Sequence, residues 1–380
     1  MAHVKDFGLG PDEIMVRDTA RSFLAEHAAV ETLRRLVARD HHEAYESAVQ
    51  PAQWDEALWG KMVELGWTGL GVPEAHGGVG MRTVAVALLA EEIGRAAVPS
   101  PLTTTLIATA VLRAADAGKW LAKVAEGTAV SLATMSEAGS LRWDDTGITA
   151  AKSGKDFTLR GAASFVQDAR KVGLFIVSAK APDGLGLFAI PADAPGVKIR
   201  PDQIVDLTHD QATVELDGVT VPADAVVAAP GKAAAVLDAA LPTILTIVAA
   251  DLCGAAEWQL QTTAEYARVR SQFGHPIGFF QAVKHPIVNM MCAVDRARSL
   301  VYAAAATIDN DPKDALRLAR MAKAAASDTA AFCADRSVQL HGGIGFTWEC
   351  DVHLYFKRQK HHQLLWGDGT HHRARLAEAL

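Results

Sequence analysis

The sequence predicts an α+β protein of three domains, in which an N-terminal α-helical domain and a C-terminal helical domain flank a middle antiparallel β-sandwich or barrel. The first observation is length, because 380 residues, half of them hydrophobic, suffice for two or three cores. The second is a change of pattern, from alanine- and leucine-rich segments to short β-branched runs and back. We expect the domains to span residues 1–120, 121–230 and 231–380.

The N-terminal domain shows hydrophobic residues at helical spacing. The pattern is interrupted where helices would end, at residues 71–73 (GVP), 77–78 (GG) and 99–101 (PSP). These breaks predict an all-helical domain.

The middle domain is expected to consist of short strands. Residues 174–178 and 185–190 are hydrophobic runs, and residues 212–217 alternate hydrophobic and polar side chains. No long helical segments separate these runs, which favours antiparallel pairing over a doubly wound parallel sheet. A nicotinamide-type Rossmann domain is therefore not expected.

The C-terminal domain begins after residues 230–231 (PG), where the helical pattern returns. One face of the segment 287–301 carries hydrophobic residues every three or four positions, namely Ile287, Met290, Met291, Val294, Ala297 and Val301. This spacing predicts a helix that packs along one side.

Charge and composition exclude several classes of partner. The net charge of −7 offers no excess of cations to nucleic acid. The longest uncharged stretch, residues 96–112, contains two prolines and is shorter than the roughly twenty apolar residues that span a bilayer. The four cysteines show no CxxC spacing and no secretory signal opens the chain. We expect a cytoplasmic protein without membrane contact, disulfide framework or metal site.

Four motifs in order give the sequence its strongest functional signal. They are residues 73–80 (PEAHGGVG), 91–95 (EEIGR), 270–278 (RSQFGHPIG, followed by Gln281) and 339–346 (QLHGGIGF). Together they resemble the acyl-CoA dehydrogenase family over nearly the whole chain. The resemblance implies that family's fold, with a four-helix bundle in the C-terminal domain, and it implies FAD as cofactor.

The last two motifs also have a physical interpretation. A Gly-Gly pair lets backbone N–H groups approach a pyrophosphate, Arg270 neutralises it and Phe273 lies against an adenine or ribose face. The alternative is that Gly342-Gly343 only ends a helix and Arg270 forms a surface ion pair. The resemblance implies that Arg270, Phe273, Gln281, Gln339, Gly342 and Gly343 hold the ADP half of FAD, largely for a neighbouring subunit.

The segments that hold the flavin ring in the family are altered here. The family's [ST]-E-P-G-A-G-S-D loop corresponds to residues 136–143 (SEAGSLRW), and its W-I-[ST]-N clamp corresponds to residues 165–168 (FVQD). The resemblance therefore weakens at the isoalloxazine pocket.

The catalytic base of the family is also altered. Removing a proton α to a thioester carbonyl needs a carboxylate of raised pKa, while hydride leaves Cβ for the flavin. The family's glutamate falls on Trp366 without a gap, or on Asp368 if residues 368–370 (DGT) replace E-G-T. The alternative helix position of that glutamate corresponds to Ile244. Asp368 is the candidate base, with a carboxylate one methylene shorter.

Four histidines flank this segment, namely His361, His362, His371 and His372. Adjacent histidines on a helix point in different directions, which disfavours a metal site. We expect a solvated polar stretch there, with Trp348 and Trp366 as core or interface aromatics.

The combined pattern suggests a division of labour between two related subunits. The chain resembles the subunit without catalytic base in actinobacterial α2β2 acyl-CoA dehydrogenases that act on sterol side-chain thioesters. That resemblance implies α,β-dehydrogenation of a bulky acyl-CoA with a paralogous partner, and electron transfer to an electron-transfer flavoprotein. The alternatives are a self-sufficient homotetramer that uses Asp368, a flavin-free acyl-CoA-binding or scaffold protein, and a flavin monooxygenase.

Overall fold

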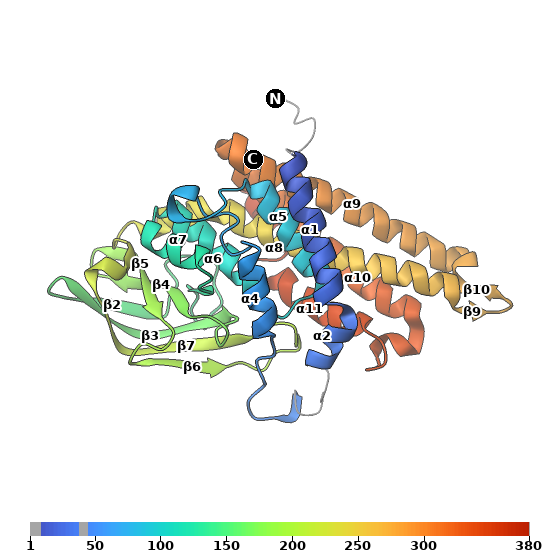
Figure 1. The fold of residues 1–380 in the computed structure, drawn as a ribbon, viewed down its shortest axis with the longest axis horizontal. Coiled ribbons are helices and arrows are strands. Elements are labelled where there is room, and N and C mark those ends of the chain that lie inside the picture. Colours follow the sequence, from blue (N-terminus) through green and yellow to red (C-terminus); the bar gives the residue numbers. More distant parts are fainter. Residues whose placement is uncertain (1–8, 38–44, 380) are drawn as a thin grey trace.

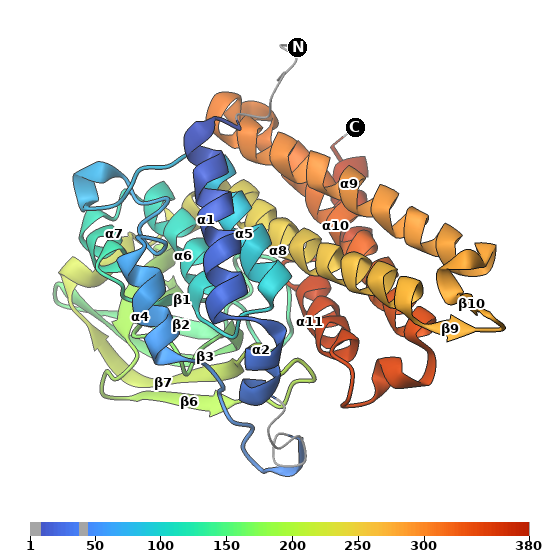
Figure 2. The same cartoon turned by 45° about the vertical axis from the view of Figure 1, so that its right-hand side comes forward.

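The computed structural model describes residues 9–37 and 45–379. The β-sheet of the middle domain lies at one end of the molecule, and the long helices of the C-terminal domain extend away from it to the opposite end (Figure 1). The N-terminal helices cover the region between these two parts (Figure 2). This order of helical, β and helical domains confirms the predicted fold class.

The regular secondary structure that is described before residue 126 is all helical, as the spacing predicted. The helices are α1 (Pro11–His27), α2 (Val30–Val37), α4 (Glu56–Glu64), η1 (Glu74–His76), α5 (Thr83–Ala96), α6 (Leu102–Ala114) and α7 (Gly118–Ala125). Helix α4 begins at Asp55, whose carboxylate accepts the backbone N–H groups of Ala57 and Leu58. Helices α5 and α6 are buried on nearly all sides. They pack against α8 of the C-terminal domain, and α6 also packs against β1 of the middle domain.

The middle domain is a single, mostly antiparallel sheet. Its strands are β1 (Val130–Ala133), β2 (Ile148–Ser153), β3 (Asp156–Gln167), β4 (Leu174–Ala181), β5 (Gly184–Pro191), β6 (Val197–Pro201), β7 (Gln211–Val221) and β8 (Val226–Ala228). They are ordered β6-β7-β3-β2-β4-β5-β8, with β1 on the side of β4. Contrary to the expectation of purely antiparallel pairing, β1 and β2 pair with β4 in parallel. The intervening β2–β3 hairpin supplies the crossover that a parallel pair needs.

The C-terminal domain consists of long antiparallel helices. They are α8 (Ala233–Val269), α9 (Gln281–Asn310), α10 (Pro312–His341), α11 (Val352–Leu364) and α12 (Gly369–Ala377). Helix α8 is long and apolar enough to cross a membrane, but 61% of its most apolar window is buried inside the fold. It packs against α5, α9 and α10. Most hydrophobic residues in this window of α8 therefore face protein, as in a core helix.

Helices α5 and α8 approach each other unusually closely, and a glycine on each side allows this contact. A Cβ atom at Gly94 would lie 2.0 Å from the carbonyl oxygen of Asp251, and one at Gly254 would lie 1.8 Å from that of Glu91. Nearby, Arg298 of α9 pairs with Glu91 at 2.7 Å. The motif at residues 91–95 thus joins the N-terminal domain to the bundle.

Candidate functional site

The six residues predicted to hold ADP lie together at the end of the bundle farthest from the sheet. Arg270 ends α8, Phe273 lies in the turn between β9 (Ser271–Gln272) and β10 (His275–Pro276), and Gln281 begins α9. Gln339, Gly342 and Gly343 lie where α10 passes into η4 (Gly342–Phe346). The two segments meet directly, because the Tyr266 ring stacks on His341 with centroids 4.3 Å apart.

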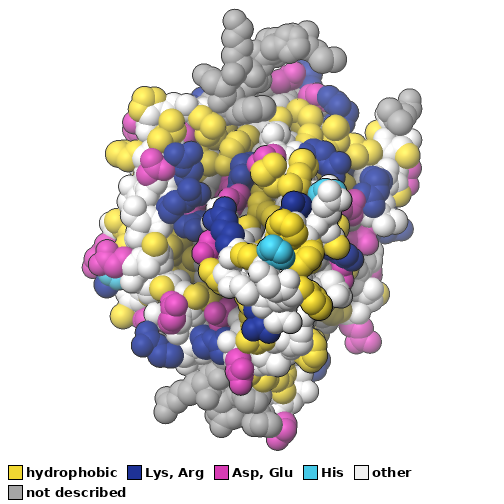
Figure 3. Space-filling view, turned by 90° about the vertical axis from the view of Figure 1, so that its right-hand side faces the viewer, with side chains coloured by type: hydrophobic (Ala, Val, Ile, Leu, Met, Phe, Trp, Pro, Cys, Tyr) yellow, Lys and Arg dark blue, Asp and Glu magenta, His cyan; other side chains and the backbone are white. Residues whose placement is uncertain are grey.

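This end of the bundle presents open backbone and exposed rings. Gly342 adopts φ +67°, and a Cβ at Gly342 or Gly343 would meet no described atom within 4 Å. Phe273 is 89% exposed and also lies in the left-handed region, at φ +54°. A side view shows hydrophobic side chains mixed with Lys and Arg on this face (Figure 3). The face thus combines a cation, an aromatic ring and accessible backbone, the groups that an ADP moiety requires.

The segment predicted to meet the flavin ring lies at the end of β3. A register shift against β7 between Ala163 and Val166 bends this end, and Phe165 and Asp168 have positive φ. The amide of Gln167 donates to Gln211 Oε1 at 2.9 Å, and its Oε1 lies 2.7 Å from His361 Nε2. Gln167 therefore already has partners from two domains.

A buried network of charged groups lies behind this segment, where α8, α11 and the middle domain meet. Arg358 donates to Asp251 at 2.6 Å and to Thr208 at 2.9 Å, and His362 Nδ1 lies 3.0 Å from Asp251. Burial alone would raise the pKa of Asp251, but Arg358 and His362 outweigh it and hold that pKa well below its usual value. Asp251 is therefore an ionised, buried partner of Arg358.

The histidines of α11 belong to this network, so the expected solvated C-terminal stretch is wrong. His361 packs against His209 with ring centroids 5.6 Å apart, and burial lowers the pKa of His361 to about 4. Burial and Arg358 hold the pKa of His209 well below its usual value. The rings of His361 and His209 are therefore neutral near pH 7, and His209 is buried while His361 is half-buried. Sequence reasoning missed the two α11 histidines because the partner of His362, Asp251, and that of His361, Gln167, each lie more than a hundred residues earlier.

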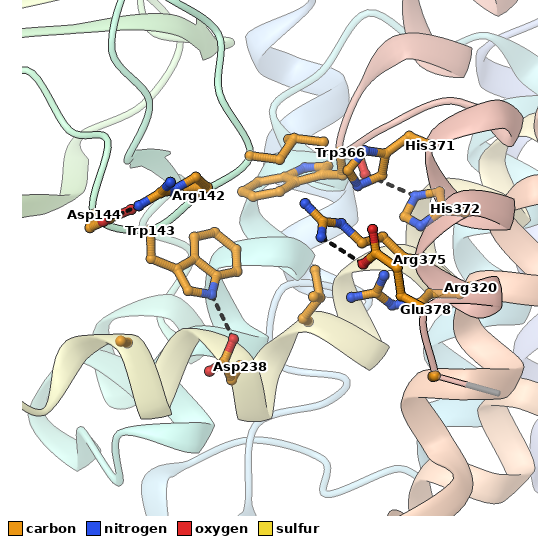
Figure 4. A pocket seen from close by; sticks show the side chains of 14 residues that line it. Arg142, Trp143, Asp144, Asp238, Arg320, Trp366, His371, His372, Arg375 and Glu378 are labelled. Carbon is orange, nitrogen blue, oxygen red and sulfur yellow. Dashed lines mark hydrogen bonds and ion pairs between the residues drawn. The ribbon is translucent and has the colours of Figure 1, made fainter.

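Three cavities adjoin the same region. A charged cleft of about 570 Å³ is lined by Arg142, Trp143, Asp238, Arg320 and Arg375 (Figure 4). An outer groove of about 530 Å³ is lined by Phe165, His361, Lys357 and Lys360. An inner pocket of about 30 Å³, with Thr103, Thr104, Ser131, Asp168 and His209 in its wall, shares a lining residue with each of the other two cavities.

The charged cleft is lined by three arginines and three carboxylates, and Arg320 is the arginine that could receive an anion. Arg142 pairs with Asp144 and Arg375 with Glu378, but Arg320 forms no ion pair with any residue that the structure describes. Burial and the neighbouring Arg375 lower the pKa of Arg320. A phosphate or other anion in this cleft would relieve that repulsion.

Trp366, rather than Asp368, faces the cavities. Trp366 lies in the walls of the charged cleft, the inner pocket and the outer groove. Asp368 lines none of these three cavities, and its carboxylate caps α12 by accepting the backbone N–H of His371 at 2.8 Å. Ile244 is buried in the core. The role of Asp368 as catalytic base stays a prediction. In the structure its carboxylate caps the N-terminus of α12.

Two family models match the chain at its two ends. The acyl-CoA dehydrogenase N-terminal domain matches residues 10–128, and the acyl-CoA dehydrogenase C-terminal domain matches residues 245–380. Between these matches lies most of the sheet, including the altered residues 136–143 and 165–168.

The chain is also similar to individual proteins along most of its length. It is 32% identical over 349 residues to acyl-CoA dehydrogenase IpdE2 of Mycobacterium tuberculosis, covering 90% of this chain and 89% of the relative. The structure of a Tcur3481-Tcur3483 steroid acyl-CoA dehydrogenase variant aligns at TM-score 0.82 and 28% identity, over 97% of each chain. The ChsE4-ChsE5 complex from Mycobacterium tuberculosis shares the fold at TM-score 0.85, with 24% identity over 98% of each chain. The chain belongs to the acyl-CoA dehydrogenase family, whose members are oxidoreductases that act on acyl-CoA.

Proposed function

We propose that this chain is the subunit without catalytic base in a heteromeric, FAD-dependent acyl-CoA dehydrogenase. In this assembly it holds the ADP half of an FAD whose flavin ring lies in a paralogous partner. The observation that carries the proposal is the placement of Arg270, Phe273, Gln281 and the Gly342-Gly343 pair at the ends of α8, α9 and α10, with Phe273 and both glycines open to solvent.

Each residue of this face has a chemical role toward ADP. The Arg270 guanidinium neutralises the pyrophosphate, the Phe273 ring covers an adenine or ribose face, and the amides of Gln281 and Gln339 offer donors and acceptors. When bound, FAD supplies the acceptor for the hydride that leaves the substrate Cβ. Asp168, the carboxylate in the described wall of the inner pocket, already accepts a hydrogen bond from Lys171 at 2.9 Å, which supports a subunit without its own base.

The substrate class and partners follow from the relatives. The Tcur3481-Tcur3483 steroid enzyme is among the similar proteins, which favours a bulky or sterol side-chain acyl-CoA. The charged cleft, with Arg320 and Arg375, suits the phosphates of the CoA nucleotide. We infer an α2β2 assembly in the cytoplasm that passes electrons to an electron-transfer flavoprotein, as the family does.

The first experiment measures bound flavin for each chain. The full chain is expressed alone and together with candidate paralogues, and the absorbance of oxidised flavin is compared with protein concentration. We expect flavin only on co-expression, with one FAD for each pair of chains. Stoichiometric flavin together with turnover in the isolated chain would refute the subunit assignment and favour a self-sufficient homotetramer that uses Asp368.

The second experiment tests the ADP contact itself. Arg270→Ala in the assembled complex is expected to lower flavin occupancy at least tenfold, because a charge-assisted contact to phosphate is lost. Arg268→Ala is the matched control, since Arg268 is also exposed near the end of α8 and pairs with Glu265 at 3.2 Å. Equal flavin content in the two variants would remove the basis for the ADP assignment.

A further inference from the structure

Trp366 occupies an unusual position, because one side chain forms part of the wall of three separate cavities. It borders the charged cleft, the inner pocket and the outer groove, and it is only 8% exposed. The cleft and the groove each enclose more than 500 Å³, whereas the inner pocket holds about 30 Å³ and shares Trp366, but no other lining residue, with the wall of the cleft. The indole therefore stands where a path between these spaces would run.

The backbone around Trp366 is held in a conformation that a bulky residue rarely adopts. Trp366 has φ +59° and Gly367 has φ +96°, and such strain persists only where the surroundings impose it. A Cβ at Gly367 would lie 2.6 Å from His371 Cδ2. The turn therefore requires glycine at 367, and it leaves the indole little freedom to swing aside.

Two buried side chains fix the carbonyl groups of this turn. Lys323 of α10 donates to the carbonyl oxygen of Gly367 at 2.7 Å and to that of Gln363 at 3.0 Å. His372 Nε2 lies 2.9 Å from the carbonyl oxygen of Trp366. On its open side the indole packs near Trp143, with centroids 6.0 Å apart, and Trp143 is itself held by a 2.7 Å bond to Asp238. Contacts on both sides of the turn thus keep Trp366 in place.

We infer that Trp366 is a partition that excludes the acyl chain of a CoA thioester from this subunit. The charged cleft remains open to the CoA nucleotide, but the indole closes the path from that cleft into the inner pocket. This inference rests on the proposed function, and it assigns a specificity-determining role to a residue that contacts no described catalytic group. The chain then distinguishes CoA from acyl-CoA poorly, because the acyl group stays in solvent.

The test compares the affinities of CoA and dodecanoyl-CoA for the purified full chain by calorimetry. For the wild-type chain we expect the two affinities to agree within about threefold, since no methylene is buried. Trp366→Gly suits φ +59° and opens a space of roughly the 150 Å³ that admits a benzene-sized ligand. In this variant dodecanoyl-CoA is expected to bind at least about tenfold more tightly than CoA, because each buried methylene contributes roughly a fourfold factor.

Matched variants separate the partition from other effects. Trp366→Phe keeps a ring in the path and is expected to behave as the wild-type chain. Leu241→Ala removes a hydrophobic side chain from the cleft wall but not from that of the inner pocket, so CoA and dodecanoyl-CoA should again bind equally. If Trp366→Gly does not fold, Trp366→Asn, which also tolerates positive φ, takes its place.

Several results would overturn the partition. They are a tenfold preference of the wild-type chain for dodecanoyl-CoA, no gain in the Gly or Asn variant, and no binding of either ligand to any variant. These measurements use no flavin. Flavin content after co-expression tests the subunit assignment, whereas the binding measurements test the role of Trp366. A failure of one can therefore be distinguished from a failure of the other.

Discussion

Lys323 is a buried amine with a structural role. It donates hydrogen bonds to the carbonyl oxygens of Gln363 and Gly367, on either side of Trp366. It also donates to Ser327 Oγ at 2.9 Å, so all three of its hydrogen-bonding positions are used. Burial lowers the pKa of Lys323 to about 7, against a smaller opposing effect of Asp368. The group therefore titrates near neutral pH in the folded state and near 10.5 when unfolded.

This difference predicts a pH dependence of stability. Between about pH 7 and pH 10 the unfolded chain binds the proton that the folded chain has released, so Lys323 makes the free energy of unfolding rise with pH. Lys323→Met should flatten this rise in urea denaturation. The exposed Lys155 provides the control, since Lys155→Met should leave the slope unchanged. Equal slopes for the wild-type chain and Lys323→Met would contradict the prediction.

The Asp251–Arg358 pair gives a second prediction at the scale of single residues. Both side chains are 1% exposed, so removing one charge leaves the other buried without its partner. Asp251→Asn is expected to lower the free energy of unfolding by about 3–5 kcal/mol. The double variant Asp251→Asn, Arg358→Met should lose clearly less than the sum of the two single variants. Simple additivity in urea denaturation would show that the pair is not coupled.

At the scale of elements, the contact of α5 with α8 depends on small residues at their closest approach. Gly254→Ala would place a methyl group 1.8 Å from the carbonyl oxygen of Glu91, and the helices would have to separate. We expect a loss of about 1–3 kcal/mol in stability by thermal or urea denaturation. Gly60 of α4 is the matched control, because a Cβ there meets no described atom within 4 Å. Gly60→Ala should instead stabilise the helix by about 0.5–1 kcal/mol. A Gly254→Ala variant as stable as the wild-type chain would refute this account of the helix contact.

Helix α9 and strand β1 show which features of the elements could be predicted from the sequence and which could not. In α9 the buried positions include Met290, Val294, Ala297 and Val301, as the helical period predicted, whereas Met291 is 46% exposed. Periodicity finds the face that packs, but it does not find the edge of that face. The parallel pairing of β1 with β4 also lay beyond prediction, because pairing partners depend on the path of the chain between them.

The residues of the candidate site also fall into those that the sequence could predict and those that it could not. The residues at the end of the bundle were predictable because each lies in a short motif, and helices of similar length bring the two motifs together. The buried network around Asp251 and Arg358 was not, since a charged residue in an apolar helix gives no signal about its distant partner. Trp366 was noticed only as an aromatic at the position of the family's glutamate. Its place between three cavities required the packed structure.

At the scale of the whole molecule, the open end of the bundle predicts that the isolated chain associates with another chain. Hydrophobic side chains gather there, including Val269, Phe273, Phe279, Met291 and Phe346, all between 46% and 89% exposed. A patch of this kind is unusual on a monomer. In the isolated chain the available occupant is a second copy, and in the proposed heteromer the occupant would be the partner subunit.

The last prediction concerns this face. The double variant Phe273→Asp, Phe346→Asp should unfold at nearly the wild-type temperature, because both rings are largely exposed and contribute little to the fold. Sedimentation should show self-association weakened at least about 100-fold, the effect of losing two central aromatic contacts. Val205 is 63% exposed in the middle domain, so Val205→Asp serves as control and should associate normally. Unchanged association of the double variant would contradict this prediction, because it would mean that the face makes no contact with a second chain in solution. This chain would then have to hold an ADP moiety without help from a neighbouring subunit.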